Sequence, residues 1–367
     1  LVLSVSVGVT ILTTALSLTN GFERDMVSRL LGTTPHLSVY NPLTGGLADH
    51  EALRDKLKDR PHVEAVTPFI QGQGLLTTPG GSTVGVIVRG VSPALEKDNP
   101  NWAKYMIAGD LHDPPDMAGV VLGSEVARKL GVGLGDRLTL VTGLANKRQA
   151  RVTGLFESGL YEFDAHVAFL SLPTAQAVYN LGSQVSGLSV LLDEAFVAPK
   201  LSREWSRELM LGVRSWTDQN RNLLEAMAIE RWVIFIVIMF IVLVAMIGVG
   251  STMARWVIEK NREISLLRAI GVSGRAVGRL FMVQGTLISA VGVLLGSIGG
   301  YGLSLLLSVF PIGLSGEVYF LSRLPVHIEP RDFALVAAAT MILSPFASLL
   351  PALRAMRLDP IEVIRRT

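Results

Sequence analysis

Titratable side chains that could support chemistry are sparse in this sequence. The densest group lies in the segment DLHDPPD, which has the residue types of a metal site: Asp110, His112, Asp113 and Asp116. Two consecutive prolines in this segment favour a solvated turn instead. The other histidines are scattered, and the motifs GxxxxGK[ST], HExxH and GxSxG are absent from the sequence. We therefore predict that the chain is not an enzyme, holds no metal and binds no cofactor itself.

The segment EKNREISLLRAIG, residues 259–271, is charged and strongly helix-forming, although it lies between two long apolar runs. Its apolar residues recur at three-residue steps, as an amphipathic helix requires: Ile264, Leu267 and Ile270, with Leu266 beside them. Charged residues occupy the other faces: Glu259, Lys260, Arg262, Glu263 and Arg268. Gly271 is suited to end the helix. Such a helix can lie on a lipid surface or dock into a groove on a cytoplasmic partner, and the residues alone leave both readings open.

The elements around this segment are predicted from hydropathy. The chain has 367 residues, of which 49% are hydrophobic, and its mean hydropathy is +0.44. A membrane-crossing helix needs about 20 apolar residues, and four segments meet that requirement: 1–19, 231–254, 280–310 and 333–351. The first segment lacks the basic region and cleavage site of a signal peptide, so we expect a retained span whose cytoplasmic flank precedes Leu1.

The fold class predicted is an α-helical membrane domain of four transmembrane helices plus a large α+β extracytoplasmic domain inserted between helices 1 and 2. That domain, with helical stalks, takes residues 20–230. Strands are predicted at 83–91, 137–143, 150–156, 166–171 and 186–192, and helices at 124–130, 173–181 and 199–211. Ser124 is the expected N-cap of the first of these helices. Mixed strands and helices indicate an α+β domain.

Basic residues predict the orientation of the spans. The loop 255–279 and the tail 352–367 are rich in arginine, whereas the loop 311–332 balances its arginines with acidic residues. The first two segments are therefore expected in the cytoplasm, and the loop 311–332 and the large domain on the other side. The net charge of +2 indicates no nucleic-acid partner, and the absence of cysteine fits a domain in an oxidising compartment without disulfides.

Small and apolar residues in the spans indicate helix packing or ligand contact. Gly292, Gly296 and Gly300 recur at four-residue steps, which lets another helix approach closely. Aromatic and flexible side chains in the second span could contact acyl chains: Phe235, Met239 and Phe240. Ordinary contact with membrane lipid or with the core of the helix bundle would explain these three side chains equally well.

Several motifs together resemble one family. They are Glu259-Lys260 with Glu263, Ile264, Leu267 and Gly271; FMVQG at 281–285; NGFE at 20–23; LFESGLYEFD at 155–164; and the closing segments 318–333 and 349–365. In this order they resemble the permease subunits of the bacterial lipoprotein-releasing ABC transporter, LolC and LolE, within the MacB/FtsX-like permease superfamily. The resemblance covers nearly the whole chain, although the last motif is shared across the superfamily.

The resemblance implies functions that the spacing of residues along the sequence does not show. The helix at 259–271 would be a coupling helix on a LolD-like ATPase, which would bind ATP and Mg. The large domain would be a MacB-like periplasmic core domain of two subdomains. A second LolC/LolE-type permease or a second copy would complete a lipoprotein cavity lined by spans one and two, to which we assign Asn20, Phe22, Phe235, Met239 and Phe240. Acylated lipoproteins would leave the inner membrane for a LolA-like periplasmic chaperone.

One departure from the family leaves the subunit type open. LolC has a long β-hairpin hook that recruits the chaperone, whereas the corresponding connection here is short, TGLANKRQ at 142–149. A LolE-like subunit, a merged subunit that forms homodimers, and a sequence that lacks residues here all remain possible. Two other functions compete: an FtsX-like signalling subunit that activates a wall hydrolase, and a MacB-like efflux permease. The long periplasmic region and NGFE favour lipoprotein release over the first, and the absence of a fused ATPase disfavours the second.

Overall fold

A computed structural model describes residues 1–96, 104–143, 146–309 and 325–356. Most of the predicted loop 311–332 and of the predicted tail 352–367 lies outside these residues. The described chain divides into two compact units. The helical unit contains residues 1–25, 225–309 and 325–356, and the mixed unit contains the described residues from 26 to 224.

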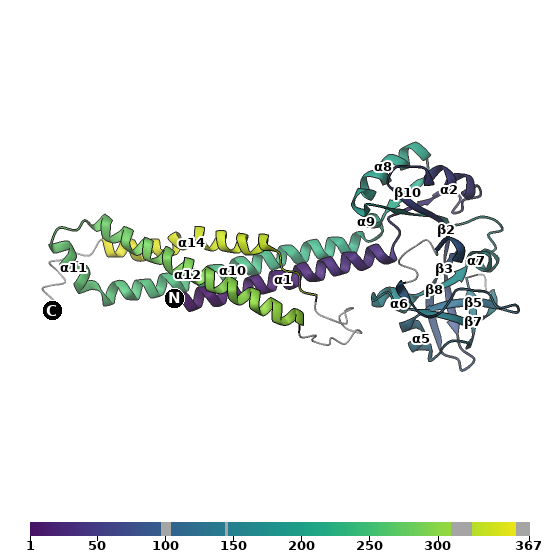
Figure 1. The fold of residues 1–367 in the computed structure, drawn as a ribbon, viewed down its shortest axis with the longest axis horizontal. Helices are drawn as coiled ribbons and strands as arrows, with labels where there is room; N and C mark the ends of the chain where they lie inside the picture. Colours follow the sequence, from purple (N-terminus) through teal and green to yellow (C-terminus); the bar gives the residue numbers. More distant parts are fainter. Residues whose placement is uncertain (97–103, 144–145, 310–324, 357–367) are drawn as a thin grey trace. The chain divides into compact units, whose positions relative to one another are not determined.

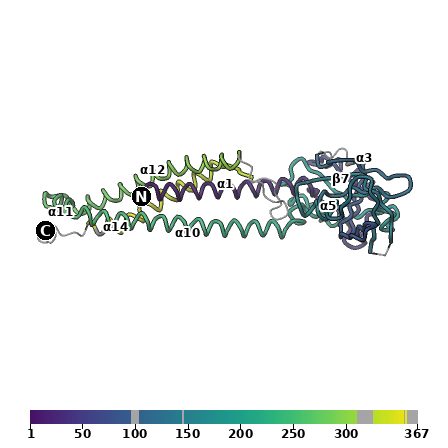
Figure 2. Tube along the Cα trace, turned by 90° about the horizontal axis from the view of Figure 1, so that it is seen from below, coloured from purple at the N-terminus to yellow at the C-terminus, as the bar shows by residue number. Residues whose placement is uncertain are grey.

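The helical unit is built from long apolar helices with one short charged helix: α1 (Val2–Thr33), α10 (Arg221–Glu259), α11 (Asn261–Ala269), α12 (Gly274–Val309) and α14 (Pro330–Met356). Four of the described helices, all except α11, are long and apolar enough to cross a membrane. Within this unit they lie side by side (Figure 2). Their shared core includes Val9 of α1, Met246 and Met253 of α10, Val293 of α12 and Val336 of α14. Hydropathy therefore locates all four helices, although α1 continues well beyond residue 19 and α10 begins before residue 231.

The mixed unit contains one large sheet (Figure 1). Its strands are β1 (Leu37–Tyr40), β2 (Val63–Thr77), β3 (Thr83–Val91), β4 (Met106–Gly109), β5 (Ala118–Gly123), β6 (Arg137–Thr142), β7 (Lys147–Phe156), β8 (Val167–Ser171), β9 (Gly187–Leu192) and β10 (Gly212–Ser215). The pairs β3–β8 and β5–β7 are parallel, and the other pairs are antiparallel. The predicted α+β character of this region is confirmed.

Strand β2 joins two parts of this sheet because it is long enough to pair twice along one edge. Residues 63–69 pair with β9, which continues to β1 and β10, whereas residues 74–77 pair with β6. Because β6 also pairs with β7, the strands β2, β3, β8, β5, β7 and β6 close into a ring. Each strand of the ring therefore pairs with a neighbour on both sides, and hydrophobic side chains of these strands join one core.

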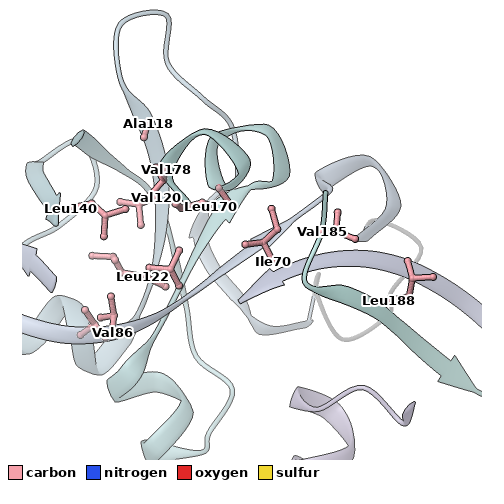
Figure 3. Packing of buried hydrophobic residues seen from close by; sticks show 14 of the residues in the cluster. Ile70, Val86, Ala118, Val120, Leu122, Leu140, Leu170, Val178, Val185 and Leu188 are labelled. Atoms are coloured by element: carbon pink, nitrogen blue, oxygen red, sulfur yellow. The ribbon is translucent and has the colours of Figure 1, made fainter. Parts of the chain in front are cut away.

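Short helices cover the sheet: α2 (His50–Lys58), α3 (Pro93–Glu96), α5 (Ser124–Leu130), α6 (Tyr161–His166), α7 (Leu172–Tyr179), α8 (Ala198–Leu209) and α9 (Trp216–Gln219), with a 3-10 turn at Ala195–Val197. The core beneath them is aliphatic, and Figure 3 shows Leu122 and Val120 of β5 facing Leu140 of β6 and Val86 of β3. The expected Ser124 cap is wrong. Ser124 is the first residue of α5, and Gly123 occupies the N-cap without a side-chain hydrogen bond.

His36 follows the end of α1 and joins it to the sheet through hydrogen bonds with Leu192. His36 is 8% exposed, the Leu192 N–H donates to its Nδ1 at 3.0 Å, and the Leu192 carbonyl oxygen lies 3.1 Å from the same nitrogen. Burial lowers the pKa of His36 from its usual value of about 6.5, against smaller opposing effects of the Leu192 backbone and the Glu64 charge. Folding therefore favours the neutral ring. Its contribution to stability is present above about pH 6.5 and is lost as pH falls through the lowered pKa.

We expect the Leu192 amide of the full-length protein to lose hydrogen-exchange protection, relative to its intrinsic rate, between pH 8 and pH 5. Protonation removes the acceptor at Nδ1 and charges a buried ring. In His36→Gln, which keeps a neutral acceptor, the same amide should show protection that does not change with pH. Equal pH dependence in both proteins would contradict this assignment. His112→Gln, at an exposed histidine, should behave like the wild type.

Candidate functional site

The short helix α11 is separated from the spans on both sides by defined backbone signals. Helix α10 ends at Glu259, and Lys260 is the N-cap of α11. At the other end Gly271 has φ 103°, a value that favours glycine, its N–H bonds to the Arg268 carbonyl, and the Val272 N–H bonds to the Leu267 carbonyl. This is the Schellman arrangement. The predicted helix and its glycine stop are therefore confirmed.

The apolar side chains of α11 divide between two faces. Ile264 is 5% exposed and packs in a cluster with Val257, Val277 and Ala355. Three others point outward and are 62%, 40% and 74% exposed: Leu266, Leu267 and Ile270. The prediction that Ile264 shares one docking face with Leu267 and Ile270 is therefore wrong. Ile264 anchors α11 to its own spans, because the turns at Lys260 and Gly271 bring α10 and α12 to that side.

Charged residues surround the outward apolar patch, which is defined here as Leu266, Leu267 and Ile270. Lys260 Nζ contacts Glu263 Oε1 at 2.6 Å, and both side chains are about two-thirds exposed, so their pair contributes little stability. Glu259 and Arg262 are also exposed, and Arg268 is half-buried. An apolar centre within a charged rim is the composition of a protein-binding surface.

The predicted glycine stripe is a helix-packing surface, as the structure shows. A Cβ at Gly292 would lie 2.7 Å from Val5 Cβ, and one at Gly296 would lie 2.6 Å from Val9 Cβ. A Cβ at Gly300 would overlap the Thr13 hydroxyl. The Thr10 hydroxyl also donates to the Gly296 carbonyl at 3.1 Å. Helix α12 therefore packs its glycines against α1 at close range.

A second close packing joins α12 to α14 through serines that the sequence analysis did not use. Ser344 Oγ donates to Ser289 Oγ at 2.7 Å and lies 3.2 Å from the Gly285 carbonyl. A Cβ at Gly285 would overlap Ser348 Oγ. The signal was available, because Ser344, Ser348 and Ala352 recur at four-residue steps.

The NGFE segment ties together three parts of the helical unit. Asn20 donates to the carboxylate of Asp332, and a Cβ at Gly21 would overlap the Pro325 carbonyl. Arg231 of α10 donates through Nε to Glu23 Oε1 at 3.0 Å. The next residue, Arg24, pairs with Glu329 at 2.5 Å. Charged residues beside the ends of apolar runs were the signal that could have indicated these partners.

The structure places the predicted cavity residues in two settings. Asn20 belongs to the network around Asp332, and Phe22 beside it is half-buried. Three residues of α10 are exposed on the helical unit, by 57%, 52% and 57%: Phe235, Met239 and Phe240. Their contact with lipoprotein stays a prediction.

The LFESGLYEFD segment forms a loop organised by a buried carboxylate. Asp164 is 3% exposed and accepts from Ser158 N at 2.8 Å, Ser158 Oγ at 2.7 Å and Gly159 N at 3.1 Å. Burial raises the pKa of Asp164, and these hydrogen bonds oppose that shift. Gly159, at φ 80°, presents its carbonyl to Arg29 Nη1 at 2.9 Å. The loop therefore holds the last turns of α1 within the mixed unit.

The DLHDPPD segment contributes internal hydrogen bonds. Asp113 accepts from the Gly119 N–H at 2.9 Å and from Thr174 Oγ1 at 2.9 Å, and Ser171 Oγ donates to the same carboxylate. Asp110 Oδ1 accepts from the Leu111 N–H at 2.7 Å. Within the described parts of the chain, no group of three or more His, Asp or Glu side chains is arranged to hold a metal ion.

Comparisons with known proteins agree with this architecture. The family model of the MacB-like periplasmic core domain matches residues 1–207, and that of the FtsX-like permease C-terminal region matches residues 235–360. Four apolar helices, a MacB-like domain and a short helix between two spans define a permease subunit of the ABC transporter class.

The curated relatives narrow this class to one family. A lipoprotein-releasing system transmembrane protein LolC from Neisseria meningitidis is 30% identical over 98% of this chain and 92% of its own length. LolC from Xylella fastidiosa is also 30% identical, over 99% of this chain and 92% of its own length. LolE from Haemophilus influenzae is 28% identical over the same shares. The chain belongs to the LolC/LolE family of lipoprotein-releasing system transmembrane proteins.

Proposed function

We propose that this chain is the transmembrane subunit of an ABC transporter that extracts acylated lipoproteins from the bacterial inner membrane. In this proposal the four apolar helices cross that membrane, and the mixed unit is inserted between the first two on the periplasmic side. The excess of arginine in the 255–279 loop supports this orientation, because basic loops stay in the cytoplasm.

The outward patch of α11 is the observation that carries the proposal. Three large apolar side chains lie exposed together on this loop: Leu266, Leu267 and Ile270. Exposed apolar patches of this kind mark protein-binding surfaces, so we expect a cytoplasmic protein to cover them. Ile264 fixes the helix to α10 and α12, so a force applied to the patch reaches those spans. We assign the patch to a LolD-like ATPase partner that binds ATP and Mg and hydrolyses ATP, so this chain itself is not catalytic.

The energetics of acyl transfer explain why such a subunit needs partners. Withdrawing an acyl chain from lipid costs about 0.8 kcal/mol per methylene, so several long chains cost tens of kcal/mol if water receives them. The chains must therefore be sheltered, moved by an energy source and received by another apolar site. The spans, with a second LolC/LolE-type permease or a second copy, would shelter them. A LolA-like periplasmic chaperone would receive them.

Mass spectrometry of the proteins and lipids that co-purify with the full-length chain from its native membrane tests this proposal. We expect an ATPase, acylated lipoproteins and either a companion permease or this chain alone, which would show whether the complex is mixed or homodimeric. An ATPase together with a wall hydrolase, and no lipoprotein, would overturn the proposal in favour of a signalling subunit. Recovery of an ATPase with small amphipathic compounds but no lipoprotein would overturn it in favour of efflux.

A further inference from the structure

The contact between α1 and α12 repeats itself along both helices. Residues at four-residue steps on α1 face residues at four-residue steps on α12, in the same order: Val5 on Gly292, Val9 on Gly296 and Thr13 on Gly300. The three α1 side chains are all β-branched and therefore similar in shape, and the three α12 residues that receive them are identical. The two helices thus meet through a row of equivalent contacts.

The hydrogen bonds between these helices repeat at the same interval. Thr10 Oγ1 donates to the Gly296 carbonyl at 3.1 Å, and Thr14 Oγ1 lies 3.5 Å from the Gly300 carbonyl oxygen. A carbonyl oxygen has two lone pairs, so one within a helix can accept a second hydrogen bond. If α1 moved by one turn toward the C-terminal end of α12, the same two threonines would meet the Gly300 and Ser304 carbonyls.

Ser304 is the next residue of the α12 row, one turn beyond Gly300. Its side chain is fully buried, and its Oγ has no hydrogen-bond partner among the residues that the structure describes. A buried hydroxyl without a partner destabilises the arrangement that leaves it so. After a step of one turn Thr13 would lie against Ser304. Rotation about its χ1 would then turn its hydroxyl, which now donates to the Val9 carbonyl, toward the Ser304 hydroxyl.

We propose that α1 has two registers on α12, one helical turn apart, and that ATP turnover by the partner ATPase moves α1 between them. Equivalent contacts make the two registers similar in packing, and one-turn steps of one element past another occur in switching proteins. The inference rests on the proposed function, which supplies the ATPase. Because α1 continues without a break into the mixed unit, the step would reach that unit as a movement of its first helix.

Polar contacts near residue 20 of α1 hold the described register. Asn20 donates to Asp332, and Arg24 pairs with Glu329. A step of one turn would separate both pairs. The Arg24 side chain is 61% exposed, so its ion pair contributes little stability and is easily broken.

Disulfide trapping in the full-length chain tests the two registers, because these 367 residues include no cysteine. A Cβ at Gly299 would lie 3.8 Å from Thr10 Cβ, which suits a disulfide in the described register. In the second register Ser6 would take the place of Thr10. The variants therefore share Gly299→Cys and add Thr10→Cys, Ser6→Cys or Thr14→Cys. Positions 6 and 14 each lie about 6 Å from position 10 along the helix axis.

We expect the pair at positions 10 and 299 to cross-link in membrane vesicles from the native host without nucleotide. ATP and Mg should lower that yield severalfold and raise the yield of the pair at 6 and 299 severalfold. The pair at 14 and 299 reports a step in the opposite direction and should not cross-link. Absence of the 6 and 299 cross-link with ATP, or an equal rise at 14 and 299, would overturn the inference. Absence of the 10 and 299 cross-link would contradict the described register.

Lipoprotein release by wild-type vesicles separates failure of this inference from failure of the proposed function. Release with ATP but no cross-link at 6 and 299 would overturn only the second register. No ATP-dependent release of lipoprotein would count against the proposed function as well.

Ser304→Ala gives a second readout, because its hydroxyl is unpaired only in the described register. Its thermal unfolding temperature should not fall below that of the wild type. In the background of cysteines at 6 and 299, the ATP-dependent cross-link should fall about fivefold, the equivalent of one hydrogen bond of about 1 kcal/mol. Ser308→Ala, at an exposed residue of the same helix whose Oγ bonds to the Leu305 carbonyl, is the matched control and should change neither quantity. An unchanged cross-link in Ser304→Ala would contradict the second register.

Discussion

Leu267→Glu is expected to abolish lipoprotein release and capture of the ATPase partner while the protein remains folded. Leu267 is 40% exposed on α11, beside Leu266 and Ile270, in the centre of a charged rim. A carboxylate buried in an apolar interface without a partner costs several kcal/mol. Loss of a central interface residue typically costs about 2 kcal/mol or more, which is about 30-fold in affinity. Co-purification of the ATPase and release of lipoprotein from proteoliposomes measure the effect.

Two further variants separate docking from folding. Leu43→Glu, at a residue 93% exposed in the mixed unit, introduces the same charge away from α11 and should leave capture unchanged. Ile264→Glu places a charge in the cluster of Val257, Val277 and Ala355 and should reduce the yield of folded protein. Normal ATPase capture by Leu267→Glu would contradict the coupling role of the patch. Loss of capture in Leu43→Glu would show that the effect is not specific.

Gly296→Leu is expected to disrupt the helical unit. A Cβ at this position would lie 2.6 Å from Val9 Cβ and 2.7 Å from the Ser6 carbonyl oxygen. The second contact is with helix backbone, so rotation of a side chain cannot relieve it, and α12 must move away from α1. Overpacking costs about 3 kcal/mol at the upper end of the usual range. The separation would also break the hydrogen bond from Thr10 to the Gly296 carbonyl.

Thermal unfolding in detergent, followed by size-exclusion chromatography, measures this effect. Gly302→Leu is the matched control, because it lies on the same helix and a Cβ there meets no other atom within 4 Å. We expect the control to unfold at the wild-type temperature and Gly296→Leu to unfold many degrees lower or to aggregate. Equal stability of the two variants would show that α12 does not need close contact with α1.

Local signals predict much of the helical unit correctly. Hydropathy locates α1, α10, α12 and α14, because a span must be apolar along its whole length to lie in lipid. Gly271 marks the end of α11, because the left-handed backbone conformation at a helix end favours glycine. The glycines of α12 indicate a close helix neighbour. These features depend on residues near each other in the sequence, so pattern analysis reaches them.

Long-range partners escape the same analysis. Asn20 with Asp332, and Glu23 with Arg231, each join residues hundreds of positions apart. Strand β2 (Val63–Thr77) is not among the predicted strands, and nothing within its sequence shows that its two ends pair with different strands. The wrong prediction for Ile264 also arises from contacts between segments far apart in the sequence. Its spacing matches that of Leu267 and Ile270, but the turns around α11 decide which side chain faces the protein's own helices.

The sequence by itself determined the family, the four long apolar helices, the short charged helix between two of them and the α+β nature of the large domain. Composition, periodicity and ordered motifs act locally, and the chain carries them before it folds. Only the tertiary structure decided that Ile264 is an anchor, that α12 packs its glycines on α1, and that β2, β3, β8, β5, β7 and β6 close into a ring, because each of these depends on contacts between segments far apart in the sequence.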